Sequence, residues 1–391
     1  QYAVDGVAPT PDGSVTIGTR QQLVWSFESK LNWTQDFTED IRSTFVTGFQ
    51  GYRDETNTAT GSGDNFSGPG LEVLDATATQ TASSSFLEVV NLGIFAQEQI
   101  DYSEWFYFTA GIRLDASSAF GDEFNYATYP KFSVSFLPTE ALGFEIPKVS
   151  TLRVRGAWGQ SGQQPGAFDR FTTFSPVNSP EGSGVVPGNL GNQDLKPEVA
   201  TEWEVGFEVG LFEDRLGLEA TYWDRVVEDA LIDRTYAPSG GFTVPQLTNA
   251  GELIGKGLEL TLNADVIQKS NFSLNVFANA AYLYEEVGSL GGAPPIKIDA
   301  TYIRDRMFIK EGFAPAAYFG TMLPSGVDFP FDSNQDGVPD SQSELEAYFS
   351  GPVDPGTFNS AVMVAGPNGE ALPGGSSYLD NYLGKPTPDW E

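Results

Sequence analysis

Residues 258–284 alternate apolar and polar side chains for longer than an ordinary globular strand does. Apolar residues take every second position, namely Leu258, Leu260, Leu262, Ala264 and Val266, then Phe272, Leu274, Val276, Ala278, Ala280, Tyr282 and Tyr284. Between them lie polar residues such as Glu259, Thr261, Ser273 and Asn275. A period of two predicts strands with one apolar face. Seven alternations in the second arm exceed the about 5–6 residues of a globular strand and fit the about 9–11 that cross a bilayer.

The same alternation recurs along the chain and predicts about ten strands. They are expected at 21–37, 40–52, 86–101, 104–115, 127–138, 150–160, 201–211, 216–222, 258–266 and 272–284. Short connections near 36–40, 101–103, 138–147, 212–214 and 267–270 alternate with long ones at 53–85, 116–126, 161–199, 237–252 and 289–376. Short turns at one rim and long loops at the other are typical of outer-membrane barrels. We therefore expect an all-β fold, an antiparallel transmembrane β-barrel with long extracellular loops.

Charge and composition exclude several function classes. The chain has a net charge of −32 and neither Cys nor His. Thiol nucleophiles, Cys/His zinc sites and Ser-His-Asp triads are therefore excluded. The negative charge would repel phosphate backbones, so we expect no nucleic-acid partner.

A soluble β-sandwich or propeller would also show alternating strands. Strand length and loop asymmetry count against both. Aromatic residues near strand ends also favour a barrel, because they would form the interfacial girdle; these are Trp203, Tyr222, Trp223, Tyr282 and Tyr284.

Two segments carry a family resemblance. Residues 192–206 read NQDLKPEVATEWEVG, and residues 249–260 read NAGELIGKGLEL. In order and spacing they resemble the N-x-x-L-K-P-E-x-x-x-E-x-E-x-G and N-A-G-x-x-x-x-K-G-x-E-L segments of TonB-dependent outer-membrane transporters. Further pieces at 95–97, 111–121, 129–133, 152–162 and 310–313 are similar to the SusC/RagA branch.

The resemblance implies a fold, a location and partners. It implies the bacterial outer membrane with its lipid, and import of a large nutrient, a glycan (oligosaccharide) or a peptide. TonB would energise import through a plug and TonB box, and a SusD-like surface lipoprotein would cover the loops. No plug or TonB box is recognisable, and 386–391 resemble the start of a further strand. We therefore expect residues 1–391 to be a central to C-terminal part of a 22-stranded barrel.

Two other functions stay open at this stage. One is a siderophore or cobalamin receptor of the same barrel class, and the other is a secreted β-rich carbohydrate-active enzyme or adhesin. Glutamates on one strand face could be read as a cation path or as glycosidase acids; they are Glu202, Glu204, Glu208, Glu219 and Glu259. A wet barrel lumen accounts for them more simply, so we expect no enzymatic activity.

Three loop phenylalanines are candidates for ligand binding or for contact with the lid protein. Phe168, Phe171 and Phe174 recur at a spacing of three in a segment rich in Gly and Pro. Their rings could stack on a sugar or contact the lid, or they could simply pack beneath the loop.

The segment 332–340 reads DSNQDGVPD and predicts a calcium loop. The ligands would be side-chain oxygens of Asp332, Asn334, Asp336 and Asp340 and the carbonyl of Val338, with Gly337 at the sharp turn. Position 12 is Ser343 instead of the usual Glu, and the alternative is an acidic surface turn.

Chelation tests this loop. If Ca²⁺ orders 332–340, removing it with EGTA should make proteolysis in 320–380 several-fold faster, and Ca²⁺ but not Mg²⁺ should reverse the effect. Equal cleavage rates with and without EGTA would contradict the calcium prediction. The variant Asp336→Asn should lose the calcium response.

Overall fold

The structure, a computed structural model, describes residues 13–121, 126–141, 146–179, 182–242, 244–298, 307–319 and 382–388. The chain divides into two units, residues 1–293 with 389–391, and residues 294–388. Among the described residues, no helix has the length and apolarity needed to cross a membrane.

The first unit is built on one antiparallel sheet of ten strands. These are β1 (Ser14–Asp36), β2 (Ile41–Phe66), β3 (Thr77–Tyr102), β4 (Phe106–Ser117), β5 (Ala127–Phe136), β6 (Val149–Gln163), β9 (Glu198–Leu211), β10 (Leu216–Arg234), β11 (Gln246–Lys269) and β12 (Phe272–Ser289). Each strand pairs with the next of these along the chain, so the sheet is an up-and-down meander. The prediction of about ten antiparallel strands is confirmed.

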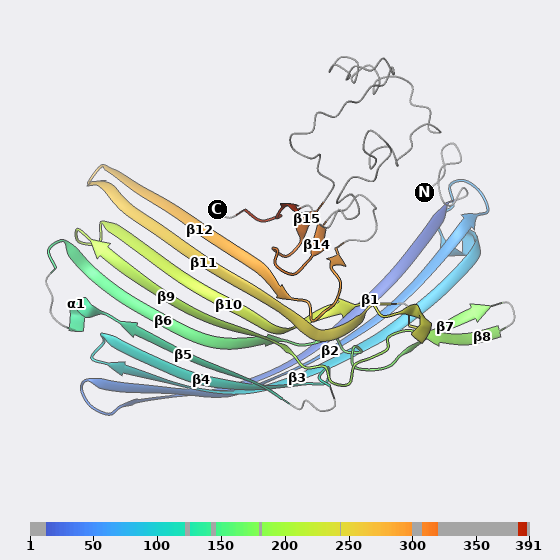
Figure 1. Cartoon of the computed structure of the whole chain (residues 1–391), viewed down its shortest axis with the longest axis horizontal. Helices are drawn as coiled ribbons and strands as arrows, with labels where there is room; N and C mark the ends of the chain where they lie inside the picture. The colour runs from blue at the N-terminus through green and yellow to red at the C-terminus, as the bar shows by residue number, and fades with distance from the viewer. Residues whose placement is uncertain are drawn as a thin grey trace, which may run out of the picture. The chain divides into compact units, whose positions relative to one another are not determined.

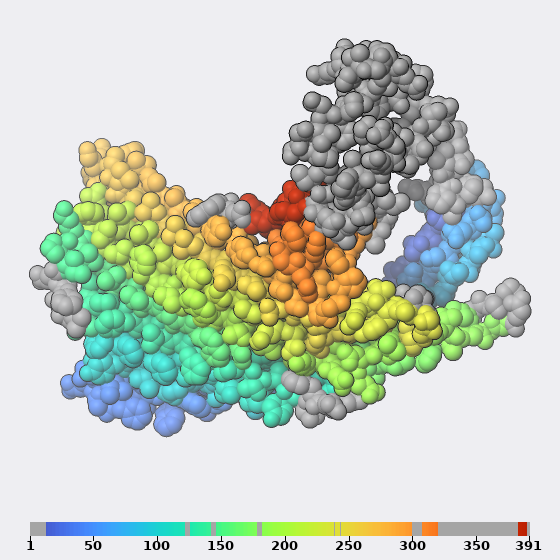
Figure 2. Space-filling model, viewed as in Figure 1, coloured from blue at the N-terminus to red at the C-terminus, as the bar shows by residue number. Residues whose placement is uncertain are grey.

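The sheet curves across its width, and neighbouring strands pack side by side as a wall (Figures 1 and 2). At one rim the strands are joined by short turns, such as 212–215 between β9 and β10 and 270–271 between β11 and β12. The one-turn helix α1 (Pro138–Ala141) lies in the β5–β6 connection at the same rim. Longer connections at the other rim include the hairpin of β7 (Phe174–Ser179) and β8 (Gly182–Pro187) and two single turns, η1 (Leu74–Ala76) and η2 (Pro238–Gly240).

The prediction of a loop at 53–85 is wrong for most of that range. Strands β2 and β3, of 26 residues each, continue through it and leave only 67–76 as a connection. At about 3.3 Å per residue such a strand extends roughly 85 Å, far beyond an apolar band of about 25 Å. The loop predicted at 237–252 is also shorter, because β11 begins at Gln246.

Strand register sorts the side chains into two faces. One row across five strands holds Val154, Phe207, Ala220, Leu260 and Ala280, and the next holds Arg155, Gly206, Thr221, Glu259 and Ala281. In a membrane barrel the apolar face meets lipid and the polar face lines the lumen. We call these the outer face and the inner face.

Aromatic side chains border the apolar band on the outer face. Trp203 lies opposite Trp158 and packs against Tyr222 with ring centroids 5.4 Å apart. Tyr282 and Tyr284 share this face. The girdle prediction fails for Trp223, because its register partners Glu204 and Gly257 place it on the inner face.

The second unit contains a small sheet of four short strands, β13 (Ile296–Lys297), β14 (Met307–Ile309), β15 (Ala317–Phe319) and β16 (Tyr382–Gly384). Phe308, Ala317 and Phe319 form its buried cluster, and Phe313 packs against them. Lys310 Nζ lies 5.0 Å from the ring centroids of both Phe313 and Phe319.

Replacing Leu260 tests the assignment of faces. The variant Leu260→Arg should lower the free energy of unfolding in phospholipid vesicles by about 2–4 kcal/mol, because a guanidinium would enter hydrocarbon. The matched variant Thr261→Arg, on the inner face, should cost much less. Denaturant titration would measure both, and a larger loss for Thr261→Arg would reverse the faces.

Candidate functional site

An ion network lies on the inner face of strands β6, β9 and β10. The guanidinium of Arg155 donates to Glu219 at 2.6 Å, to Thr221 at 2.7 Å and to Glu208 at 3.2 Å. Arg153 contacts the other carboxylate oxygen of Glu208 at 3.1 Å. These groups are partly exposed, so each pair adds little stability by itself, but together they fix side-chain positions.

A glycine makes this network possible. Gly206 lies opposite Arg155, and a Cβ at that position would stand 2.9 Å from the guanidinium Nε. Because Gly206 has no side chain, Arg155 crosses β9 and reaches Glu219 on β10. Any larger residue would have to displace the arginine.

Trp223 also packs over a glycine, Gly257. A Cβ on Gly257 would stand 2.3 Å from the indole ring, and the indole Nε1 donates to Glu259 at 3.2 Å. The guanidinium of Arg225 lies 5.3 Å from the Trp223 ring centroid and forms an ion pair with Glu202 at 2.5 Å.

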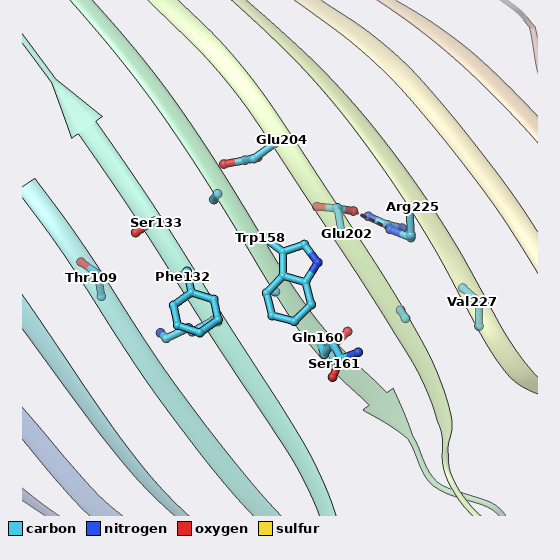
Figure 3. A pocket seen from close by; sticks show the side chains of 14 residues that line it. Thr109, Phe132, Ser133, Trp158, Gln160, Ser161, Glu202, Glu204, Arg225 and Val227 are labelled. Atoms are coloured by element: carbon cyan, nitrogen blue, oxygen red, sulfur yellow. Dashed lines mark hydrogen bonds and ion pairs between the residues drawn. The ribbon is translucent and has the colours of Figure 1, made fainter.

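A groove of about 590 Å³ is hollowed in the wall beside these residues (Figure 3). On the inner face it is bordered by Thr109, Lys131 and Ser133 from β4 and β5, and by Glu202, Glu204 and Arg225 from β9 and β10. Polar and charged groups therefore line the side that faces the lumen.

The five glutamates predicted to face inward do share the inner face. Glu202, Glu208 and Glu219 are paired with arginines, and Glu259 accepts from Trp223. Alternation identified these glutamates but missed their partners, namely Arg153, Arg155, Trp223 and Arg225, together with Lys131. The missed residues follow the same alternation, but only the register shows which carboxylate each one meets.

The phenylalanine loop, residues 164–197, joins β6 to β9 at the rim of long loops and is held by its own polar groups. The Asn189 amide donates to the carbonyls of Phe168, Asp169 and Phe171 at 3.0–3.2 Å. Its backbone N–H donates to the Thr173 hydroxyl. These contacts fix residues 168–173 relative to Asn189.

The three candidate phenylalanines lie on this loop with much of their surface in solvent. Phe168, Phe171 and Phe174 are 48%, 43% and 58% exposed. The guanidinium of Arg170 lies 4.4 Å from the Phe171 ring centroid. About half of each ring is therefore accessible in the described part of the chain, and the role of the three phenylalanines stays a prediction.

A cluster that we call the rim clamp ties the end of this loop to two other strands. It consists of Lys196, Glu198, Asp229 and Asn249. The Asn249 amide accepts from the Lys196 N–H at 3.0 Å and donates to the Lys196 carbonyl at 2.7 Å and the Asp229 carbonyl at 3.0 Å. Lys196 Nζ lies 2.6 Å from the Asp229 carboxylate, and Glu198 accepts from the Leu231 N–H.

Residues 2–359 match the protein family described as "TonB dependent receptor-like, beta-barrel". The chain belongs to this family. It is therefore part of a TonB-dependent receptor of the bacterial outer membrane, and the soluble β-sandwich alternative is wrong.

Named relatives agree with this assignment. The chain is 26% identical over 331 residues to TonB-dependent receptor P3 of Formosa agariphila, covering 81% of this chain and 31% of that protein. It is also 26% identical to TonB-dependent receptor SusC of Bacteroides thetaiotaomicron, covering 48% and 20%. The chain thus spans a third or less of these relatives. Both relatives are named as TonB-dependent receptors.

A solved structure shares the fold. The structure titled "Structure of the RagAB peptide transporter" superposes with a TM-score of 0.71 at 21% identity, covering 81% of this chain and 35% of that chain. The SusC/RagA resemblance is therefore confirmed at the level of the fold.

The motifs of this TonB-dependent receptor barrel now have physical roles. Lys196, Glu198 and Asn249 form most of the rim clamp. Gly206 leaves space for the Arg155 side chain, and Gly257 leaves space for the Trp223 ring. The predicted calcium ligands Asp332, Asn334, Asp336, Val338 and Asp340 lie outside the described residues, so the calcium loop stays a prediction.

Removing the Asn249 amide should loosen the phenylalanine loop. In Asn249→Ala, three hydrogen bonds are lost at a partly buried site, so protease cleavage within 164–197 should become about tenfold faster while the barrel stays folded. The control is Asn263→Ala, which removes the same group from the inner face of β11. Equal cleavage in both variants would show that the clamp does not hold the loop.

Proposed function

We propose that the complete protein imports a large nutrient, an oligosaccharide or a peptide, across the outer membrane. In this proposal TonB energises transport through a plug, and a SusD-like lipoprotein covers the extracellular loops. The observation that carries it is the pairing of a polar, ion-bearing inner wall with an ordered outer rim that exposes three phenylalanines. A charged wall suits passage of a hydrophilic solute, and exposed rings suit a partner.

Exposed apolar surface at the long-loop rim supports the proposed lid protein. Besides the phenylalanines, Val177, Val185 and Val186 of the β7–β8 hairpin are exposed. An isolated two-stranded hairpin is marginally stable in water, so a covering surface would stabilise it. A siderophore or cobalamin receptor is the other candidate, and no side chain in the described part of the chain favours it.

Transport is tested in cells with and without functional TonB. Uptake of labelled oligosaccharides and peptides by the complete protein should fall to background when TonB is deleted or the proton gradient is collapsed. Uptake that continues unchanged in both conditions would contradict a TonB-driven transporter.

The lid is tested separately with a double variant. Phe171→Ser/Phe174→Ser should reduce the amount of lipid-anchored partner that purifies with the barrel by fivefold or more. The control is Phe37→Ser, which removes an exposed ring from the short-turn rim. The proposed contact would be wrong if the unmodified protein, the double variant and the Phe37→Ser control all held the same amount of lipoprotein.

A further inference from the structure

Three grooves follow one another along the inner face of β6. The groove of Figure 3 shares Thr109, Ser133, Ala157 and Glu204 with a groove of about 400 Å³ that runs toward Arg153 and Arg155. It shares Lys131, Gln160 and Ser161 with one of about 450 Å³ that runs toward Tyr129 and Gly162. Because the lining residues are common, the three make one continuous depression, which we call the β6 trough.

Small residues form the floor of the trough. Along the inner face of β6 the side chains after Arg155 are Ala157, Gly159 and Ser161. Gly159 lies opposite Lys131 on β5 and Glu202 on β9. Neighbouring strands are about 4.8 Å apart, so the two banks stand roughly 10 Å apart across an open floor.

The two sides of the trough, β5 and β9, carry opposite charges that do not form an ion pair with each other. Within the described part of the chain, the ammonium of Lys131 on one bank and the carboxylate of Glu204 on the other have no hydrogen bond or ion pair. The neighbouring carboxylates are already in ion pairs, because Glu202 is paired with Arg225, and Glu208 is paired with Arg153 and Arg155. The Lys131 side chain leans over Gly111 of β4, where a Cβ would be 3.0 Å from its Cε, so its ammonium lies on the β4 side of this bank in the absence of a ligand.

We infer that the β6 trough is a binding site for a dipolar solute, and that a short peptide is the matching nutrient class. Its carboxylate would pair with Lys131 and its ammonium with Glu204, while the Thr109, Ser133 and Ser161 hydroxyls meet its amides. A neutral sugar leaves both charges without a counter-charge, and a polyanion meets the unpaired carboxylate of Glu204 beside Lys131. This inference rests on the proposed transport function and narrows its substrate class.

Binding of trialanine to the purified complete transporter tests the site. Its charged termini stand roughly 10 Å apart when extended, so trialanine reaches from bank to bank once the Lys131 side chain turns from β4 toward β6. Lys131→Gln and Glu204→Gln should each weaken trialanine binding at least about fivefold, measured by calorimetry. Binding of N-acetyl-trialanine amide, which lacks both charges, should be equal in all proteins. The double reversal Lys131→Glu/Glu204→Lys should recover affinity relative to the single variants.

Matched controls are available on β1. Lys30 and Glu28 lie on the inner face opposite Gly48 and Gln50, so Lys30→Gln and Glu28→Gln make the same chemical changes away from the trough. They should leave trialanine binding unchanged. Equal weakening by the control variants, or equal loss of the free and capped peptides, would overturn the inference.

One further outcome identifies a different occupant. If a folded part of the same polypeptide fills the trough, trialanine will not bind the native protein, and Lys131→Gln and Glu204→Gln will lower the melting temperature without ligand. That result would overturn the peptide site and leave TonB-dependent uptake intact. Loss of TonB dependence for every nutrient would instead refute the proposed function.

Discussion

Hydrogen bonding between neighbouring strands is the constraint on which the rest of this structure depends. A backbone N–H or C=O in hydrocarbon has no water to pair with, so each strand must lie against a neighbour for its whole membrane-spanning length. The ten strands meet this requirement by pairing in chain order, with β1 paired to β2 along the whole of β1. Side-chain chemistry is then free to differ between the faces.

Glycines on the inner face decide where long side chains can go. Arg155 over Gly206, Trp223 over Gly257 and Lys131 over Gly111 are three cases of one arrangement. The long residue lies across the neighbouring strand instead of projecting into the lumen. Long side chains therefore fill some positions on the inner face and leave grooves at others, and the charged groups are held in place. Family motifs such as E-x-G and K-G-x-E mark this packing and do not by themselves mark ligand contacts.

Strand number, topology and the two faces could be predicted from the sequence. Apolar and polar residues alternate along a strand that has one face against lipid and the other in water. The arms of β2 and β3 beyond the membrane could not be predicted. Thr, Ser, Ala and Gly, with Asn57 and Gln80, fill 56–63 and 77–85 on both faces, so there is no apolar contrast to detect. The pairing of Arg155 with Glu219 was also out of reach, because it joins residues 64 positions apart and depends on exact register. The exposed phenylalanines were recognisable as unusual, whereas the Asn189 contacts that order their loop were not.

The long first strands have a mechanical consequence. From Ser14 to Asp36 the ladder between β1 and β2 runs without a bulge, and β2 and β3 stay paired from Ile41 to Phe66. A ribbon of three hydrogen-bonded strands resists bending far better than a loop of the same length. A force applied at its tip, roughly 35 Å beyond Trp25 at about 3.3 Å per residue, is therefore transmitted to the strands in the membrane instead of being absorbed at a hinge.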